Sequence, residues 1–331
     1  MIKVALIGDE GRISAVYGGG RCERLAEEFD LYPDPLTVEM LTDRREELKD
    51  IECLFSTWGM PALDREQIAL FPSLKAVFYG AGSVQNFARP FLEAGVKVVS
   101  AWAANAVPVA EYTVAQILLC NKGFFSAARA AKALATRGDH DREAFPGNYE
   151  NTVSLLGAGM IGRNVIELLK PYALDVLVFD PFLCEDDAVA LGVEKVTLEE
   201  AFRRGFVVSN HLANLPATKK MLRRDLFESM RAHASFINTG RGATVDEPAM
   251  IEVLRGRPDL TAVLDVTDPE PPKEGSGLYE LENVVLTPHS AGALALEVRR
   301  LADYVIEEAI AYRDGKALRY EVTLEMLETM A

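Results

Sequence analysis

The chain has 331 residues, which is enough for two domains that each bury a core of their own. Its composition, 49% hydrophobic and 26% charged, is ordinary for a soluble globular protein. The net charge of −15, with no basic stripe, argues against binding to nucleic acid. No uninterrupted apolar run reaches the ~18 residues of a membrane-spanning helix, so we expect no membrane span.

The start of the chain and its cysteines point to the cytoplasm. "MIKVALIGDEG" reads as a strand and a turn and lacks the features of a signal peptide. The four cysteines, Cys22, Cys53, Cys120 and Cys184, form no CxxC pair and have no histidine at ligand spacing. We expect reduced thiols and no metal site.

The first hundred residues alternate short apolar runs with polar stretches of helical period. Strands are predicted at "IKVALIG", "ECLFST", "LKAVFYG" and "VKVVSA", with helices at "RCERLAEEF" and "RPFLEAG". The N-terminal "IGDEG" and "GGGR" complete no phosphate-binding spacing and are predicted to be loops. Such alternation predicts a parallel sheet covered on both faces.

A long helical segment follows. Apolar residues recur at helical spacing from Val107 to Arg137, and no proline follows Pro108, so we predict one helix that crosses between domains or packs against a second subunit. A second alternating series then runs to "NVVLTPHSAG". The segment from Leu294 to about Gly315 is again helical by period and is expected to dock on the first domain, which makes that domain discontinuous.

"LLGAGMIG" carries the spacing G-x-G-x-x-G at Gly157, Gly159 and Gly162. It follows an apolar run and opens a helical segment, and Asp180 ends the next apolar run. Gly157 permits the turn, Gly159 lets a pyrophosphate approach, and Gly162 lets helix and strand pack closely. Asp180 can accept both ribose hydroxyls and repels a 2′-phosphate, so we predict NAD(H) rather than NADP(H). The alternative is a tight turn without a ligand.

Three charged residues also follow apolar runs: Arg241 in "NTGRG", Glu270 in "DVTDPEPP" and His289 in "LTPHSAG". Each alone reads equally well as a solvated or structural residue. Together, a histidine, a carboxylate that favours its protonated form and a guanidinium that binds a carboxylate suit redox chemistry beside a nicotinamide. The glycines around Arg241 suggest a backbone pressed near a ligand.

The remaining histidines compete poorly with His289. His140 and His233 lie in polar segments and are expected at the surface. His211 ends a strand and is expected to border the cofactor.

Seven segments carry a family likeness: "VAEYTVAQIL", "LLGAGMIGRNV", "VFDP", "NHLANLPATKKML", "INTGRG", "LDVTDPEPP" and "LENVVLTPHSAG". Because these segments occur in the family's order and at about its spacing, the chain resembles the NAD-dependent D-isomer-specific 2-hydroxyacid dehydrogenases over nearly its whole length. The resemblance implies an α/β protein with two doubly wound parallel-sheet domains. A Rossmann NAD-binding domain, residues 105–292, is inserted into a discontinuous flavodoxin-like substrate domain, residues 1–104 plus 293–331.

The resemblance also implies site residues. The family's catalytic residues fall on Arg241, Glu270 and His289, and its cofactor-binding residues on Gly157, Gly159, Met160, Ile161, Gly162, Asp180, His211, Thr218, Thr239, Asp265 and Gly292. Its substrate-carboxylate loop falls on Ala81, Gly82 and Ser83. Trp58 and Tyr79 are expected to contact the substrate as well. Trp58 stands where many members of the family carry a smaller or polar residue, and Tyr79 and Trp102 add aromatic bulk near the substrate. The family also dimerises through the region 107–137, so a homodimer is expected.

The implied function is NAD-dependent interconversion of a D-2-hydroxyacid and a 2-oxoacid, with His289 as general acid and base. Two alternatives remain open: an NADH-responsive binding scaffold, and a dehydrogenase for a small inorganic anion such as phosphite. Formate is disfavoured because Glu270 stands where the family's formate enzymes carry Gln.

Overall fold

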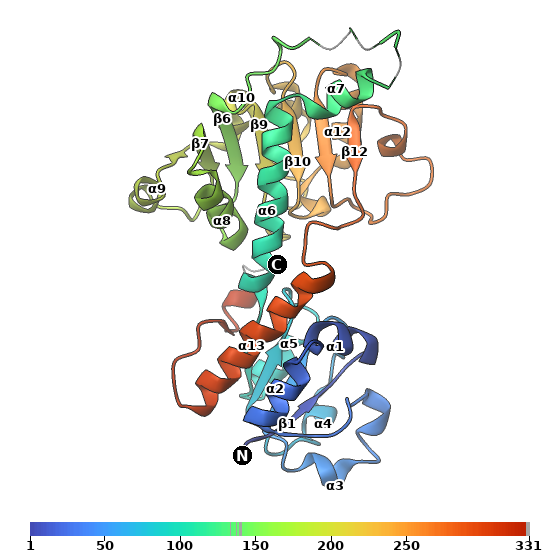
Figure 1. The fold of residues 1–331 in the computed structure, drawn as a ribbon, viewed down its shortest axis with the longest axis vertical. Coiled ribbons are helices and arrows are strands. Elements are labelled where there is room, and N and C mark those ends of the chain that lie inside the picture. The colour runs from blue at the N-terminus through green and yellow to red at the C-terminus, as the bar shows by residue number, and fades with distance from the viewer. Residues whose placement is uncertain (133, 137, 139–140, 329–331) are drawn as a thin grey trace. The chain divides into compact units, whose positions relative to one another are not determined.

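The computed structural model describes residues 1–132, 134–136, 138 and 141–328 (Figure 1). The chain divides into two compact units. Unit 1 combines Met1–Asn105 with Ala293–Ala331, and unit 2 is Ala106–Gly292.

Unit 1 contains a six-stranded sheet. Five strands are parallel in the order β5-β4-β3-β1-β2, and β13 pairs antiparallel with the edge strand β5. This 2-1-3-4-5 order of the first five strands is the flavodoxin-like one. Its strands are β1 Lys3–Leu6, β2 Asp30–Leu31, β3 Cys53–Ser56, β4 Ala76–Tyr79, β5 Lys97–Ser100 and β13 Glu321–Val322.

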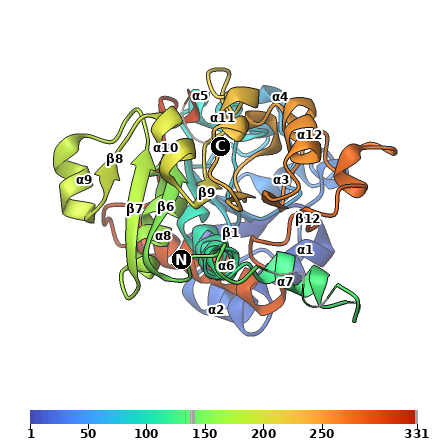
Figure 2. The same cartoon turned by 90° about the horizontal axis from the view of Figure 1, so that it is seen from above.

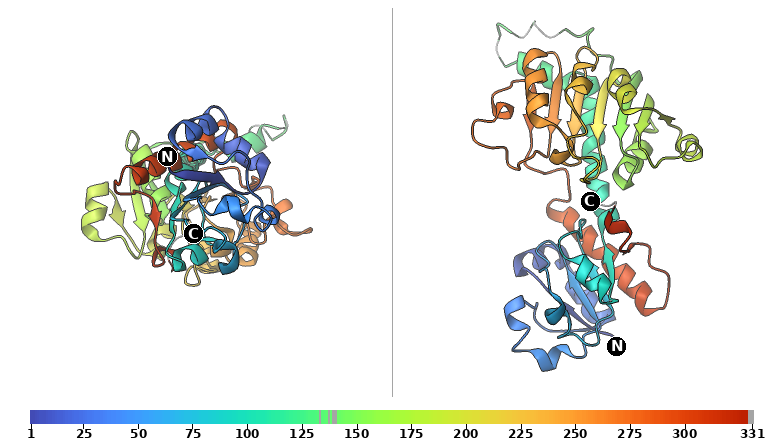
Figure 3. Two further views of the ribbon diagram at one scale, coloured as in Figure 1. Left: turned by 90° about the horizontal axis from the view of Figure 1, so that it is seen from below. Right: turned by 180° about the vertical axis from the view of Figure 1, so that it is seen from behind.

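Helices cover both faces of this sheet, as its continuously apolar strands require. One face packs on α1 Glu10–Tyr17, α2 Arg21–Glu28 and α13 Val298–Arg313. The other packs on α3 Arg45–Leu48, α4 Arg65–Ile68 and α5 Ala88–Glu93. Figure 3 shows α13 in red-orange alongside the strands of unit 1. Leu301, Val305 and Ile306 of α13 are fully buried, whereas Leu294 precedes the helix and is exposed.

Unit 2 contains a seven-stranded, fully parallel sheet in the order β12-β11-β10-β9-β6-β7-β8. Counted from its first strand this order is 3-2-1-4-5-6-7, the Rossmann order with one added strand. Its strands are β6 Tyr149–Leu156, β7 Ala173–Phe179, β8 Glu194–Lys195, β9 Val207–Asn210, β10 Ser235–Asn238, β11 Thr261–Leu264 and β12 Val284–Leu286.

Figure 2 shows helices on both faces of this second sheet. One face packs on α10 Leu198–Arg204, α11 Arg224–Glu228 and α12 Glu247–Gly256. The other packs on α6 Trp102–Asn121, α8 Met160–Leu169 and α9 Glu185–Leu191. The two sheets confirm the predicted α/β class.

The single helix predicted over 107–137 is wrong. Helix α6 begins earlier, at Trp102, and ends at Asn121; a second helix, α7, covers Phe124–Ala130. Between them Gly123 has φ 63°, and a Cβ there would lie 2.5 Å from the ring of Phe145. A left-handed glycine is a common helix stop, and it ends α6. Arg137 and His140 lie outside the described residues, and the homodimer expected through this region stays a prediction.

Helix α6 is also the one helix in the described part of the chain that is long and apolar enough to cross a membrane. More than half of its most apolar stretch is buried inside the structure. Ala110, Val114 and Ile117 pack on the sheet of unit 2. Core helices of folded proteins share this composition, so it carries no argument for a membrane span.

Candidate active site

The glycine turn joins β6 to α8 at the carboxyl end of the sheet of unit 2. Gly157 has φ 101°, and a Cβ on it would lie 3.1 Å from the carbonyl oxygen of His211. A Cβ on Gly162 would lie 2.1 Å from the carbonyl oxygen of Gly157. Around Gly159, in contrast, a Cβ would meet nothing within 4 Å. Packing therefore requires Gly157 and Gly162, while Gly159 leaves space above the turn.

Helix α8 begins directly after this turn, with Gly159 as its N-cap and no side chain capping it. Within the described residues, the backbone N–H groups of Gly159, Met160 and Ile161 donate to no protein acceptor. Free amides at the positive end of a helix attract an anion. Open space and free donors together fit a pyrophosphate group.

Asp180 follows β7 and is tied to the glycine turn. Its Oδ2 accepts a hydrogen bond from the backbone N–H of Ala158 at 2.7 Å, and its Oδ1 accepts one from Phe182 at 2.7 Å. The residue lines a cavity of about 570 Å³ together with Lys195, Glu185, Glu199 and Glu200. This cavity is predominantly acidic, which suits an adenosine ribose and opposes a 2′-phosphate.

His211 follows β9 on the same rim. Its ring nitrogens lie 3.0 Å from Ser209 Oγ and 3.4 Å from Thr239 Oγ1, and Thr239 Oγ1 lies 3.1 Å from Thr113 Oγ1. Burial lowers the pKa of His211 to about 4. The imidazole is therefore neutral near pH 7, so His211 borders the glycine turn without being suited to carry a proton.

Two other residues of the expected cofactor set are Thr218 and Gly292. The Thr218 hydroxyl donates to the carbonyl of Ala213 at 2.6 Å and accepts from the N–H of Leu215 at 2.9 Å. It closes its own turn. Gly292 is the last residue of unit 2.

His289 and Glu270 are brought together on the rim, although 19 residues separate them. Nδ1 of His289 lies 2.7 Å from Oε1 of Glu270, and the two side chains are 51% and 42% exposed. A carboxylate beside Nδ1 holds the proton on that nitrogen and leaves Nε2 as the outward one. The backbone of His289 has φ 52°, an uncommon conformation for a residue with a side chain.

Arg241 completes the trio. Its side chain is largely buried, and burial lowers the pKa of Arg241 while the nearby Glu270 carboxylate raises it. Nη1 donates to the carbonyl of Gly240 at 2.8 Å. The glycines on either side are explained by the chain itself: a Cβ would lie 3.0 Å from the Asn210 carbonyl at Gly240 and 2.1 Å from Thr267 at Gly242. Contacts within the protein therefore explain these two glycines without a ligand pressed against the backbone.

Asp265, expected beside the cofactor, is 2% exposed and holds the loop that carries His289. Its Oδ1 accepts from Thr287 Oγ1 at 2.6 Å and from the N–H of Ser290 at 2.8 Å, and its Oδ2 accepts from the N–H of Ala291 at 2.9 Å. The sequence offered no local sign of this role or of Thr287, because the bonded residues lie more than 20 positions apart.

In unit 1, the expected carboxylate loop follows β4. The hydroxyl of Ser100 lies 2.9 Å and 2.6 Å from the carbonyl oxygens of Ala81 and Gly82. Within the described chain, the N–H groups of Gly82 and Ser83 have no protein acceptor. The loop therefore turns its carbonyls to the protein and keeps donors available.

The aromatic residues expected beside this loop lie mainly in the core of unit 1. Tyr79 is buried, its ring centre is 4.7 Å from that of Phe87, and burial raises the pKa of Tyr79 to about 12. Trp58 and Trp102 are partly buried against the same core. Tyr79 is thus placed as a packing residue, while Trp58 keeps an accessible part.

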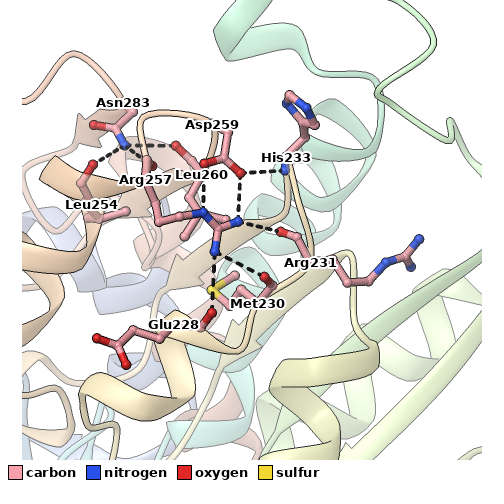
Figure 4. Close-up of polar contacts among 9 residues, drawn as sticks. All are labelled: Glu228, Met230, Arg231, His233, Leu254, Arg257, Asp259, Leu260 and Asn283. Carbon is pink, nitrogen blue, oxygen red and sulfur yellow. Dashed lines mark hydrogen bonds and ion pairs between the residues drawn. The ribbon is translucent and has the colours of Figure 1, made fainter.

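His233 belongs to a different cluster (Figure 4). Its N–H donates to Asp259 at 3.1 Å, and Asp259 accepts two hydrogen bonds from Arg257 at 2.8 and 2.9 Å. Asn283 donates to three backbone carbonyls beside them. The cluster ties together the segments that lead into β10, β11 and β12, so its role is structural. No group of metal-ligating side chains occurs among the described residues.

Comparison with known proteins identifies the family. The family model "D-isomer specific 2-hydroxyacid dehydrogenase, NAD binding domain" matches residues 114–291. The D-3-phosphoglycerate dehydrogenase of Methanocaldococcus jannaschii is 31% identical over 87% of this chain and 53% of its own length. The (S)-sulfolactate dehydrogenase of Chromohalobacter salexigens is 32% identical over 70% of this chain and 74% of its own.

Solved structures share the fold. The apo D-mandelate dehydrogenase of Rhodotorula graminis has a TM-score of 0.80 at 21% identity, covering 97% of both chains. A phosphoglycerate oxidoreductase from Rhizobium etli also gives 0.80, at 20% identity over 98% of this chain and 99% of that one. The chain spans about half the length of the phosphoglycerate dehydrogenases that it matches. It belongs to the D-isomer-specific 2-hydroxyacid dehydrogenase family, and unit 2 carries the family's NAD-binding domain.

Proposed function

We propose that this chain interconverts a D-2-hydroxyacid and its 2-oxoacid with NAD(H). The observation that carries the proposal is the 2.7 Å contact between His289 and Glu270, together with the effect of the Glu270 carboxylate in raising the pKa of Arg241. These residues follow β12, β11 and β10, and the glycine turn follows β6 of the same sheet. The carboxyl ends of parallel strands form one rim, where ligands of such sheets bind.

Each residue of the trio has a role in this reaction. The nicotinamide, when bound, supplies or accepts the hydride at C2 of the acid. Arg241 offers a planar pair of donors that fits the substrate carboxylate and polarises the neighbouring carbonyl. Nε2 of His289 donates a proton to the carbonyl oxygen in reduction and removes the hydroxyl proton in oxidation. Glu270 accepts the hydrogen bond from Nδ1 and stabilises the charged imidazolium.

Unit 1 offers donors for the acid itself. We assign the free N–H groups of Gly82 and Ser83 to the substrate carboxylate and Trp58 to the substrate side chain. Arg12, on α1, adds a cation at the carboxyl end of this sheet: a Cβ on Gly59 would lie 3.7 Å from its Cδ, and its charge lowers the pKa of Tyr79 against the stronger effect of burial. Its guanidinium has no ion-pair partner within the described residues.

An unpaired guanidinium favours a substrate with a second anionic group. Two relatives are named 3-phosphoglycerate dehydrogenase and sulfolactate dehydrogenase. Both acids in these names are 2-hydroxyacids that carry a second anionic group away from the carboxylate. We therefore propose such an acid as the substrate class. The scaffold alternative is not favoured, because a binding module does not require the paired histidine and carboxylate.

The test is a panel of 2-oxoacids assayed by NADH oxidation, including the oxidised forms of 3-phosphoglycerate and sulfolactate and uncharged analogues of similar size. We expect turnover of a distally anionic acid to the D-product, and a higher KM for that acid in Arg12→Ala. His289→Asn should lower kcat by ~10²–10⁴-fold with NADH affinity unchanged. Absence of turnover across the panel, or wild-type kcat in His289→Asn, contradicts the proposal.

A further inference from the structure

The loop that carries His289 is fastened at both ends to one buried carboxylate. Asp265 accepts hydrogen bonds from the Thr287 hydroxyl at 2.6 Å and from the N–H groups of Ser290 and Ala291 at 2.8 and 2.9 Å. The Ser290 hydroxyl adds a weaker contact at 3.3 Å. These donors lie on both sides of His289 in the chain, so the carboxylate holds the loop before and after it.

A tyrosine on α6 extends this network. Tyr112 Oη lies 3.0 Å from Thr287 Oγ1, and both residues belong to unit 2. The Thr287 proton points to Asp265, because a carboxylate only accepts. Tyr112 must therefore be the donor to Thr287. The direction of both hydrogen bonds in the chain Tyr112–Thr287–Asp265 is thus determined by chemistry.

The backbone of His289 needs such support. Its φ of 52° is uncommon for a non-glycine residue and persists where the surroundings enforce it. Its N–H donates to the carbonyl oxygens of Asp265 and Thr287, both at 3.0 Å. Glu270 orients the imidazole ring, but only the loop determines where the Cα atom lies.

We propose that Tyr112, Thr287 and Asp265 are positioning residues that hold His289 in its working place; this inference rests on the proposed role of His289 in proton transfer. Asp265 then acts on the loop that carries His289. Three donors share its Oδ1, and the residue is almost completely buried.

The experiment compares Thr287→Val, which removes the hydroxyl, with Thr287→Ser, which keeps it. Tyr112→Phe is a milder variant that leaves Thr287 and Asp265 bonded. Ser154→Ala is the matched control, since it deletes a buried hydroxyl of unit 2 whose 2.8 Å bond goes to the Ala201 carbonyl. For each, kcat, the KM of the best 2-oxoacid and the Kd of NADH are measured, with thermal unfolding as a check of folding.

Misplacing a reacting group by ~1 Å costs up to ~10²-fold in rate, so Thr287→Val should lower kcat by about 10- to 100-fold, and Tyr112→Phe by less. Thr287→Ser and Ser154→Ala should keep kcat, and the Kd of NADH should not change in any variant. In a His289→Asn background, Thr287→Val should cause no further loss, because both changes act on the same group.

Three results would overturn the inference: unchanged kcat in Thr287→Val, a weakening of NADH binding that matches the loss of kcat, or additive losses with His289→Asn. The two proposals remain distinguishable. If His289→Asn loses its activity while Thr287→Val keeps the wild-type kcat, only the positioning inference fails. If His289→Asn keeps wild-type kcat, the proposed proton carrier is wrong and the inference falls with it.

Discussion

The carbonyl oxygen of Gly157 lies only 2.1 Å from the position that a Cβ atom would take on Gly162, whereas a Cβ on Gly159 would meet no atom within 4 Å. Gly162 is therefore required for the packing of helix and strand, whereas Gly159 leaves space for a ligand. Gly159→Ala should fold normally and weaken NADH binding, because its methyl group enters the space above the free amides. Gly162→Ala should lower the melting temperature, because helix and strand must separate.

Thermal unfolding and NADH titration of both variants check this prediction. Overpacking of this kind costs ~1–3 kcal/mol, so the melting temperature of Gly162→Ala should fall by several degrees. Equal NADH affinity in Gly159→Ala and the wild type would show that the open space is not the pyrophosphate site.

Glu270→Gln should lower kcat by roughly 10- to 100-fold, less than loss of the histidine itself. The Gln oxygen can still accept the hydrogen bond from Nδ1 and preserve the ring orientation, but the negative charge that stabilises the imidazolium is gone. Steady-state kinetics with saturating NADH measures the loss. The Glu270 carboxylate also raises the pKa of Arg241, so the KM of the acid should be followed too; a change in KM alone would assign Glu270 to substrate binding.

Strand positions in both units could be predicted from apolar runs, because buried parallel strands leave a local signal. Three strands of two residues each, β2, β8 and β13, are too short to leave such a signal. Helix α1 was not predicted, and its first two residues, Glu10 and Gly11, were wrongly predicted as loop, although Asp9 caps the helix and Ile13, Val16 and Tyr17 form its buried face.

The end of α6 shows a second limit. Apolar periodicity continues past Asn121, and only the conformation of Gly123 and the packing of Phe145 against it reveal the break. Isolated glycines occur inside many helices, so the residue alone does not predict a stop.

The trio could be placed on one rim from motifs and strand ends, and the structure brings His289 and Glu270 into contact. The chain of residues behind them could not be predicted. Tyr112 and Thr287 lie 175 positions apart and touch only because α6 packs on the sheet that ends in β12. Likewise, the glycines around Arg241 reflect close backbone contacts with Asn210 and Thr267, which no local pattern encodes.

Asp180→Ala should weaken NADH binding by roughly tenfold or more, since hydrogen bonds to a charged group contribute about 1.5–3 kcal/mol. NADPH binding should weaken less, because one of the carboxylates that oppose a 2′-phosphate is removed from the cavity lined by Glu185, Glu199 and Glu200. Fluorescence titration of both cofactors gives the ratio. Asp175→Ala, an exposed change in β7, the strand that precedes Asp180, is the control. An unchanged ratio in Asp180→Ala would refute the assignment.

Asp259 and Arg257 should contribute stability that depends on pH. Hydrogen bonds from Arg257, and then from the N–H of His233, lower the pKa of Asp259 below its ordinary value of 3.8. A carboxyl group with a lowered pKa stabilises the fold fully above the unfolded value and loses that contribution as the pH falls through the folded one. Asp259→Asn should therefore cost about 1–2 kcal/mol near neutral pH, and the difference from wild type should shrink below about pH 4. Urea unfolding near neutral pH and below about pH 4 measures the difference in unfolding free energy.

Asp314→Asn is the comparison: its carboxylate pairs with Lys316 and Arg313 in water, where such pairs contribute little. Equal losses in the two variants, or a loss in Asp259→Asn that does not change with pH, would show that the cluster at the start of β10 and β11 is not held by its charges.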